Sequence, residues 1–448
     1  MPKVTVLMPS LNVAKYIHAC MESVIAQTLQ DIEILVIDAG SDDGTLEILR
    51  KYEESDLRVK IIHSNKKSYG YQINLGIAHA KGEYVGIVET DDLIMPDMYE
   101  TLYNTAVKAC AEYVKGRCVR FVEVGEDICW NQAVGTPLTD GEMLGKVLEP
   151  RNMPELLVRD IYLWTGVYKK EFISKIRLNE TPGAAFQDQG FLFQTISSAR
   201  KAVYLDKIVY QYRQNNSNSS IFNKNGFHYL VEEYAFIEKF LADKDENWKC
   251  AYYTRMFNQC MGRFDMMALS GAFWYEANQD IAILRGRLSK AVEDNILKPA
   301  YIEKRRWDLL EILLKEAKEV YSYCLNDLQK KAAPTHELLN EIDHHQVIIF
   351  CCGKYGEFLH ALLESKCPGI TVAYCDNNDE LWDTKVQGMR VLSPEMAVKK
   401  YPEAVYVIAN LGSAQTIKSQ LNGMGIMNKR IYFYHEPENI LLFHMKLM

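Results

Sequence analysis

The sequence predicts an α/β protein with more than one domain. Within the first hundred residues, short apolar runs typical of buried strands alternate with segments of helical spacing. A second pattern of this kind opens near Gln346, after a mainly helical stretch. Continuous apolar strands separated by amphipathic helices indicate parallel βαβ units. The length of 448 residues exceeds one ordinary hydrophobic core and supports two or three domains.

The N-terminal elements follow from apolar runs, helical spacing and turn residues. We expect strands at 4–8, 32–37, 59–62 and 84–88, and helices at 16–27, from 43 or 45 to 52, at 71–80 and at 98–109. Ligands bind at the carboxyl ends of such parallel strands. In this chain those ends carry the loops Pro9–Asn12, Asp38–Thr45 and Glu89–Asp92.

The rest of the chain divides into a helical region and a second α/β region. Residues 110–215 are less regular, with strands expected at 113–120 and 207–212. We expect domains at 1–225, 226–340 and 345–448, with Ala332–Thr335 as a linker. The last domain is expected to hold strands at 347–351, 370–374 and 405–409, and a helix after Gly356.

Composition narrows the function classes. Hydrophobic residues make up 48% and charged residues 25% of the chain, as in a soluble globular protein. The net charge of −8 and the absence of a dense basic run argue against nucleic acid as a partner. The eleven scattered cysteines and the lack of a signal peptide predict a cytoplasmic location. No apolar run is long enough to span a membrane, so we expect membrane contact, if any, at the inner surface.

Three carboxylates crowd the loop after the fourth predicted strand, in the run Glu89-Thr90-Asp91-Asp92. Like charges at this density are costly, and a bound divalent cation relieves that cost. Mg²⁺ and Mn²⁺ bind a few carboxylate oxygens together with phosphate oxygens, which a nucleotide diphosphate supplies. The alternative is that Asp91 or Asp92 caps the helix that follows.

A second acidic loop runs from Asp38 to Thr45. Gly40 permits a tight turn, and Asp43 is suited to cap the next helix. Asp38 is less easily explained by local structure, and its carboxylate suits a nucleotide base or ribose.

Five segments in this order and spacing resemble the family-2 glycosyltransferases, which are inverting enzymes with the GT-A fold. They are Val4–Asn12, Asp38–Thr45, Asn74–Gly76, Ala80–Tyr84 and Glu89–Asp92. The resemblance is strong over about the first 100 residues and weaker to about residue 220. It implies transfer of a sugar from a nucleotide-diphosphate donor, with a UDP-sugar favoured, to a hydroxyl on a glycan or lipid-linked acceptor. Cell-surface polysaccharide or lipopolysaccharide synthesis is the expected setting.

The resemblance also implies roles for individual residues. Pro9 and Asn12 are expected beside the nucleotide, and Asp38 at its base or ribose. Asp91, helped by Glu89 or Asp92, is expected to bind Mn²⁺ or Mg²⁺.

Four further assignments come from weaker local resemblances. The segment Tyr69–Asn74 resembles a subgroup of the family and adds Gln72 and Asn74 to the donor site. Trp164 suits a stacking platform for sugar or nucleotide, with a buried core position as the alternative. The guanidinium of Arg213 is suited to pair with the diphosphate of the donor, and the alternative is an ordinary salt bridge within the protein.

The resemblance places the catalytic base at an acidic residue well downstream, and Asp188 is the candidate. It lies between Phe186 and Phe191, and apolar neighbours raise the pKa of a carboxyl group. Such a group can take the proton of the acceptor hydroxyl as its oxygen attacks the anomeric carbon. The alternative role is capping a helix at 189–199.

The C-terminal region contains a degenerate dinucleotide-binding fingerprint. Cys351 replaces its first glycine, Gly353 and Gly356 remain, and Asp376 follows twenty residues after Gly356. We expect a Rossmann-like module that either packs and binds partners or holds a pyrophosphate. Two other functions stay open for the whole chain, a catalytically silent scaffold and an oxidoreductase centred on this module.

Overall fold

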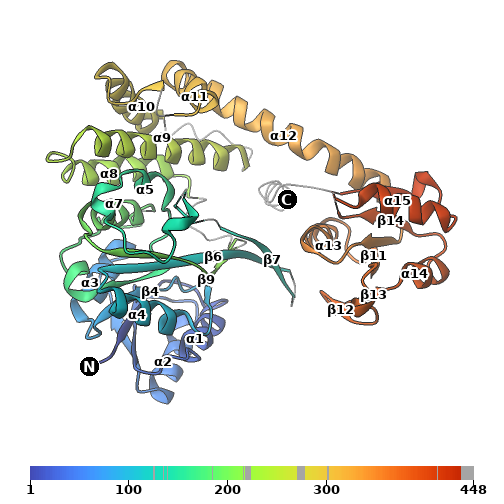
Figure 1. Ribbon diagram of the computed structural model, residues 1–448, viewed down its shortest axis with the longest axis horizontal. Coiled ribbons are helices and arrows are strands. Elements are labelled where there is room, and N and C mark those ends of the chain that lie inside the picture. The colour runs from blue at the N-terminus through green and yellow to red at the C-terminus, as the bar shows by residue number, and fades with distance from the viewer. Residues whose placement is uncertain are drawn as a thin grey trace. The chain divides into compact units, whose positions relative to one another are not determined.

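The computed structural model describes residues 1–124, 127–134, 136–138, 140–183, 185–214, 216, 223–269, 278–299, 302–410 and 412–434. These residues form two compact units. The first comprises the described parts of 1–120, 132–264 and 274–320, and the second those of 121–131, 265–273 and 321–448. Both units combine helices with a sheet, which confirms the predicted α/β class (Figure 1).

The larger sheet follows the order β3-β2-β1-β4-β8-β6-β9-β5, with β7 paired to β6. Its strands are β1 (Val4–Ser10), β2 (Ile32–Asp38), β3 (Val59–His63), β4 (Tyr84–Ile87), β5 (Leu93–Ile94), β6 (Tyr113–Val124), β7 (Asp127–Ala133), β8 (Gly166–Lys169) and β9 (Ala202–Arg213). The first four along the chain are parallel to one another, as predicted. β8 joins this half antiparallel to β4 and β6.

Strand β1 lies at the centre of the parallel half, between β2 and β4. All seven residues of β1 and of β2 are buried, which explains their continuous apolar sequences. Their register pairs Ser10 with Asp38, and Leu7 of β1 pairs with Ile87 of β4. The loops that follow these three strands therefore start at the same edge of the sheet.

The helices of this unit lie close to the predicted positions where a prediction was made. They are α1 (Ile17–Ile25), α2 (Thr45–Ser55), α3 (Tyr69–His79), α4 (Met98–Ala109), α5 (Glu155–Arg159), α6 (Lys170–Ile173), α7 (Asp188–Ser198), α8 (Gly226–Glu238), α10 (Asn278–Glu293) and α11 (Lys304–Lys315). Two longer helices, α9 (Glu246–Leu269) and α12 (Ala317–Ile342), have residues in both units. The helices α8, α10 and α11, from the predicted helical region, belong to the same unit as the larger sheet. The three-domain division stays a prediction.

The second unit contains a sheet of order β12-β13-β11-β10-β14-β15. Its elements are β10 (Val347–Phe350), α13 (Lys354–Lys366), β11 (Thr371–Cys375), β12 (Lys385–Val386), β13 (Met389–Leu392), α14 (Pro394–Lys400), β14 (Val405–Ile408), α15 (Ala414–Gly423) and β15 (Ile431–Phe433). The strands β13, β11, β10, β14 and β15 are parallel, and the order reverses at β10. This order is that of a Rossmann-like sheet, as predicted.

The predicted linker at Ala332–Thr335 is wrong. These residues lie inside α12, with Pro334 within the helix. A proline removes one backbone hydrogen bond and usually kinks or ends a helix. Here Ala332 and Thr335 are buried on either side of it, so side-chain packing offsets that cost.

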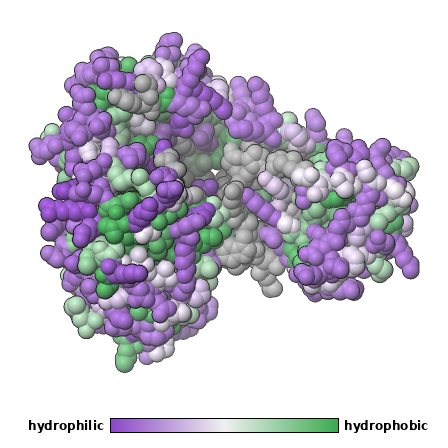
Figure 2. All heavy atoms as spheres, in the orientation of Figure 1, coloured by the Kyte–Doolittle hydropathy of each residue, from purple (hydrophilic) through white to green (hydrophobic). Residues whose placement is uncertain are grey.

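The space-filling view gives the distribution of hydropathy over one face of the molecule (Figure 2). Figure 2 shows a visible face on which hydrophilic residues predominate. No helix among the described residues combines the length and apolar character that crossing a bilayer requires.

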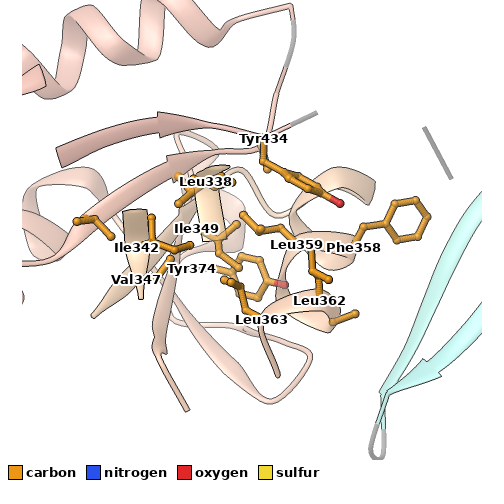
Figure 3. Packing of buried hydrophobic residues seen from close by; sticks show 14 of the residues in the cluster. Leu338, Ile342, Val347, Ile349, Phe358, Leu359, Leu362, Leu363, Tyr374 and Tyr434 are labelled. Atoms are coloured by element: carbon orange, nitrogen blue, oxygen red, sulfur yellow. The ribbon is translucent and has the colours of Figure 1, made fainter. Parts of the chain in front are cut away.

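Leu359 in α13 lies at the centre of the core of the second unit. It is fully buried, and Figure 3 shows it with Leu363 of the same helix beside Ile349 and Tyr374 of the sheet. This helix face therefore buries one face of the sheet, and a second cluster that includes Ile348 and Phe350 lies on the other.

We predict that Leu359→Ala destabilises the second unit by about 2–5 kcal/mol, because it leaves a cavity in a packed core. Hydrogen exchange followed by mass spectrometry would localise the loss to peptides of residues 347–408. The control Met396→Ala removes a side chain that is 51% exposed and should cost less than about 0.5 kcal/mol. Equal effects of the two variants would contradict this assignment of the core.

Candidate active site

The loop after β2 is organised by Asp38. Its Oδ1 accepts hydrogen bonds from the amides of Gly40 and Ser41, both at 2.9 Å, and its Oδ2 accepts one from the Ser41 hydroxyl at 2.6 Å. Gly40 has a φ of +85°, the left-handed conformation expected for a glycine in this turn. Asp38 is fully buried, so its first role is to shape the loop. Its predicted contact with a base or ribose stays a prediction.

Asn12 connects the loop after β1 to the loop after β2. Its backbone N–H donates to Ser41 Oγ at 2.9 Å, and its side-chain Oδ1 accepts from the backbone N–H of Asp42 at 2.9 Å. The φ of Asn12 is +54°, a left-handed conformation that asparagine tolerates better than most residues. Nearby, the carbonyl of Pro9 accepts from the Thr90 hydroxyl at 2.9 Å, which ties the end of β1 to the acidic loop.

Gln72 and Asn74 of α3 use their side chains to hold backbone segments. Gln72 Nε2 donates to the carbonyls of Ser10 at 3.0 Å and Ile37 at 2.5 Å, which fixes the ends of β1 and β2 together. Asn74 accepts from the Leu178 amide and donates to the Leu178 carbonyl, both at 3.0 Å. Both residues therefore shape the edge of the candidate site, and direct contact with a donor stays a prediction.

Glu89 lies at the start of the acidic loop and is largely enclosed. Its Oε1 accepts a 2.6 Å hydrogen bond from the hydroxyl of Tyr69 in α3. Burial raises the pKa of Glu89 to about 8, the Tyr69 hydrogen bond opposes this rise, and the negative charges of Asp91 and Asp188 add to it. The smallest of these contributions is that of Asp188, which belongs to α7.

Asp92 is buried completely and holds strand β9. Its Oδ1 accepts from the backbone amide of Arg213 at 2.8 Å, and its Oδ2 accepts from the hydroxyl of Tyr210 at 2.9 Å. Burial, and then the charge of Asp91, raise its pKa well above the ordinary value. Because both oxygens are used within the protein, Asp92 is a less suitable metal ligand than its neighbours.

Asp91 is partly exposed and is joined to β9 differently. Its Oδ2 accepts from Asn216 Nδ2 at 2.7 Å, whereas Arg213 Nε donates to its backbone carbonyl at 2.6 Å. The buried guanidinium of Arg213 also lies 4.7 Å from the centre of the Tyr16 ring. Arg213 thus brings a cation to the acidic loop, which is the position its predicted role at a diphosphate requires.

The alternative that Asp91 or Asp92 caps α4 is wrong. The short strand β5 lies between the acidic loop and this helix, and the N-cap residue is Asp97, without a side-chain capping bond. The side chains of Asp91 and Asp92 instead bond to β9 and to Asn216.

The carboxylates of this loop fit a cation shared with a phosphate group better than a cage made by protein alone. No group of three or more His, Cys, Asp or Glu in the described chain is arranged to hold a metal ion. Asp91 Oδ1 and Glu89 Oε2 accept no hydrogen bond from the described residues, which leaves one oxygen of each for a ligand. Mg²⁺ commonly binds through one or two carboxylates, with phosphate oxygens and water completing its shell.

Asp188 is the first residue of α7 and reaches the acidic loop through a short series of contacts. The neighbouring Gln187 accepts from the Gly70 amide through its Oε1 at 2.7 Å, and Tyr69, next to Gly70, donates to Glu89. A Cβ on Gly70 would lie 1.9 Å from the Asn179 carbonyl oxygen, so the segment before α7 is packed tightly on α3. The start of α7, which carries Asp188, is thereby joined to the helix whose Tyr69 bonds to Glu89.

The chemistry of Asp188 is that of a shielded carboxyl group. Burial raises its pKa above the ordinary value, and the positive charge of Arg255 opposes the rise. The preceding Phe186 has a φ of +68°, a strained conformation for an aromatic residue that turns the chain into α7. Asp188 is therefore a shielded carboxyl group at the start of α7, and its role as the base stays a prediction.

Trp164 is packed inside an aromatic cluster. Its ring stacks on Tyr210 at 4.0 Å and on Tyr162 at 4.5 Å, and 7% of its surface is exposed. This geometry favours the core alternative, and a contribution of Trp164 to donor binding would act through Tyr210, which bonds to Asp92.

Several residues of this site were not found from the sequence. Tyr69 was noted only as part of a motif, and Tyr210 only as part of a strand. Glu233 of α8 and Arg255 of α9 had no sequence signal, because a single charged residue in a helical pattern normally faces solvent. Their burial, at 0% and 3% exposed, depends on how α8 and α9 pack against α7.

The segment of the dinucleotide-binding fingerprint forms the expected turn after β10, but with Cys351 in place of the first glycine. Cys351 takes a φ of +84°, the conformation for which the pattern usually has glycine, and a Cβ on Gly356 would lie 2.1 Å from the Cys351 carbonyl oxygen. Asp376 Oδ2 accepts from the Cys352 amide at 2.9 Å. The acidic residue thus stabilises the loop after β10, and binding of a dinucleotide stays a prediction.

Comparisons with known proteins indicate the family that this chain resembles. The family model described as glycosyl transferase family 2 matches residues 5–164. Glycosyltransferase GlyA of Streptococcus pneumoniae is 29% identical over 51% of this chain and 33% of its own length. The uncharacterized glycosyltransferase YibD of Escherichia coli is 30% identical over 50% of this chain and 65% of its own length. The chain thus spans between a third and two thirds of these relatives.

A solved structure supports the fold. Residues 1–349 of Staphylococcus aureus TarS, in complex with UDP-GlcNAc, match with a TM-score of 0.54 at 18% identity. The match covers 73% of this chain and 92% of that one. This likeness confirms the expected GT-A fold.

Asp92 and Asp91 should respond differently to truncation. We predict that Asp92→Ala lowers the free energy of unfolding by about 1–3 kcal/mol, because it strands the buried Tyr210 hydroxyl and Arg213 amide. The partly exposed Asp91 should tolerate Asp91→Ala with a change below about 1 kcal/mol. Chemical denaturation of both variants measures this, and the reverse order of the two losses would refute the structural role of Asp92.

Proposed function

We propose that this chain, which belongs to the family-2 glycosyltransferases through its residues 5–164, transfers a sugar from a nucleotide-diphosphate donor to an acceptor hydroxyl. The observation that carries the proposal is that α3 bonds both to Gln187, next to Asp188, and to Glu89 at the start of the acidic loop. A transferase needs a place for the diphosphate and a base on the side of the acceptor, and this edge of the sheet offers both.

The donor is proposed to lie along the edge formed by the loops after β1, β2 and β4. A UDP-sugar is favoured, since UDP-GlcNAc is the ligand in the similar TarS structure. Arg213 places a positive charge at the acidic loop, where it suits a diphosphate. Asp91, with Glu89, would hold Mn²⁺ or Mg²⁺, which when bound would neutralise charge on the departing diphosphate.

Asp188 is proposed to act as the general base. Its carboxylate would accept the proton of the acceptor hydroxyl while that oxygen forms a bond to the anomeric carbon and the bond to the diphosphate breaks. Attack from the face opposite the leaving group inverts the configuration of the sugar. The acceptor proposed is a glycan or lipid-linked sugar, handled in the cytoplasm at the inner face of the membrane.

The proposal predicts metal-dependent donor binding. In the presence of Mn²⁺, at least one of the UDP-, GDP-, CDP- or dTDP-sugars should raise the melting temperature, because a ligand that binds only the folded state stabilises it by mass action. A concentration of 100 times Kd adds about 2.7 kcal/mol. EDTA should abolish the shift, and Asp91→Ala should weaken it strongly.

The control for this experiment is Asp206→Asn, which changes an exposed aspartate of β9 that pairs with Arg117. It should leave the donor shift unchanged. A panel in which no donor changes the melting temperature would speak for the scaffold alternative.

The proposal also predicts how activity depends on pH. The base works only when ionised, and the pKa of Asp188 is raised by burial, so kcat/KM should fall as the pH drops through a value above that of an ordinary aspartate. Asp188→Asn should lower kcat by about 10²–10⁴-fold while leaving donor binding intact. Transfer assays across pH 4 to 9 provide the measurement. Full activity of Asp188→Asn would remove Asp188 from the mechanism.

A further inference from the structure

The helices α8 and α9 direct two buried charged side chains at the first turn of α7, where Asp188 lies. Arg255 of α9 and Glu233 of α8 are almost completely buried. Both come from the helical region, which lies beyond the 5–164 match to the family model. Charged residues are rarely buried without a specific partner, so their partners indicate what they do.

Arg255 is held in place by backbone carbonyl groups and by Gln189, while its Nη2 is buried without a hydrogen-bond partner among the described residues. Its Nη1 donates to the carbonyls of Leu157 and Asp160 at 3.2 and 3.3 Å, at the C-terminal end of α5. Its Nε donates to Gln189 Oε1 at 2.7 Å. No carboxylate within the described ranges forms an ion pair with Arg255, so its charge is not locally cancelled and acts on Asp188.

The side-chain amide of Gln189 connects Arg255 to Asp188 by hydrogen bonds. Its Oε1 accepts from Arg255 and, at 3.3 Å, from Gln259 Nε2 of the same helix α9. With the oxygen fixed by two donors, the amide nitrogen must face the other way, where it donates to Asp188 Oδ2 at 2.8 Å. Reversing the amide would set its NH₂ against the guanidinium, which also only donates.

The backbone of the same turn is held from α8. Glu233 Oε1 accepts from the Gly190 amide at 2.7 Å. A Cβ on Gly190 would lie 2.5 Å from this oxygen and 3.1 Å from the ring of Phe236, so α8 packs directly on the turn. The carboxylate of Asp188 is therefore fixed both through its neighbour's side chain and through its backbone.

We propose that Arg255 is a positioning residue for the base, and that it orients the Asp188 carboxylate through the side-chain amide of Gln189. This inference rests on the proposed function, since it assigns Asp188 the role of base. In the resting site the arginine also favours the ionised carboxylate, which is the form that accepts a proton. Arg255 of α9 lowers the pKa of Asp188 through its charge. The charge of Asp188 in turn raises the pKa of four neighbouring groups, Glu233 and Tyr234 of α8, Tyr69 of α3 and Glu89 after β4.

Three variants test this relay through the pH profile of kcat/KM. Arg255→Met removes both the positive charge and the hydrogen bond that orients Gln189. The acid limb of the profile, where kcat/KM falls with decreasing pH, should therefore move to higher pH. The plateau, the pH-independent maximum of kcat/KM, should fall about 10-fold, which corresponds to about 1.4 kcal/mol. Gln189→Met should lower the plateau and move the limb in the same direction. Arg255→Lys keeps the charge but loses the planar fork, so its plateau should fall while its limb stays near that of the unchanged protein.

The matched control is Arg285→Met. Arg285 likewise donates to carbonyls at a helix end, those of Leu314 at 2.7 Å and Lys315 at 2.6 Å, but α11 is its partner. This variant should leave the pH profile unchanged. If Arg255→Met fails to fold, as judged by circular dichroism, Gln189→Met decides. An acid limb that stays in place in a folded Arg255→Met or Gln189→Met protein overturns the proposal, even if the rate falls.

Failure of the proposed function itself would look different. The unchanged protein would then transfer and hydrolyse no donor, and no pH profile would exist. In that case ¹³C NMR of aspartate Cγ groups, with Asp188→Asn to assign the signal, follows the titration of Asp188 directly. The relay predicts a titration displaced to higher pH in Arg255→Met and in Gln189→Met, and an unmoved titration would refute it without reference to catalysis.

Discussion

The two hydrogen bonds accepted by Asp92 join parts of the chain that are 118 and 121 residues apart. Through Tyr210 and the Arg213 amide, this buried carboxyl group holds the end of β9 against the loop after β4. The same strand end brings the guanidinium of Arg213 to the carbonyl of Asp91. The end of β9 is thus held to the acidic loop at both Asp91 and Asp92. An unpaired buried polar group is costly, so the connection is also difficult to break.

The carboxyl groups of the acidic loop differ in how far the protein itself uses them. Asp92 is satisfied inside the protein, whereas Asp91 and Glu89 each keep an oxygen that the described residues do not use. The turn that carries Asp188 is held by α8 and α9, whose sequences lie outside the 5–164 match to the family model. The proposed site thus combines a sheet edge inside the matched segment 5–164 with support from helices outside it.

Much of the sheet was predictable, because a buried parallel strand leaves a continuous apolar run such as Val4–Met8 or Ile32–Ile37. The helix at 98–109 was likewise placed from its spacing. The motif residues were found because a loop at a strand end concentrates carboxylates and glycines. The interior of the helical region was not predictable, since nothing in the sequence shows that Glu233 and Arg255 face inward. Pro334 misled for a related reason, because packing on both sides of it maintains a helix that local propensity would end.

The central claim is that Asp91 and Asp188 face the same donor from opposite sides. A crystal structure with Mn²⁺ and a non-hydrolysable nucleotide-sugar, with anomalous diffraction at the manganese edge, tests it most directly. The account predicts a manganese peak about 2.0–2.3 Å from a carboxylate oxygen of Asp91 and from a diphosphate oxygen, with Asp188 facing the anomeric carbon. A donor bound with its sugar directed away from Asp188, or a manganese peak remote from the acidic loop, would contradict the account.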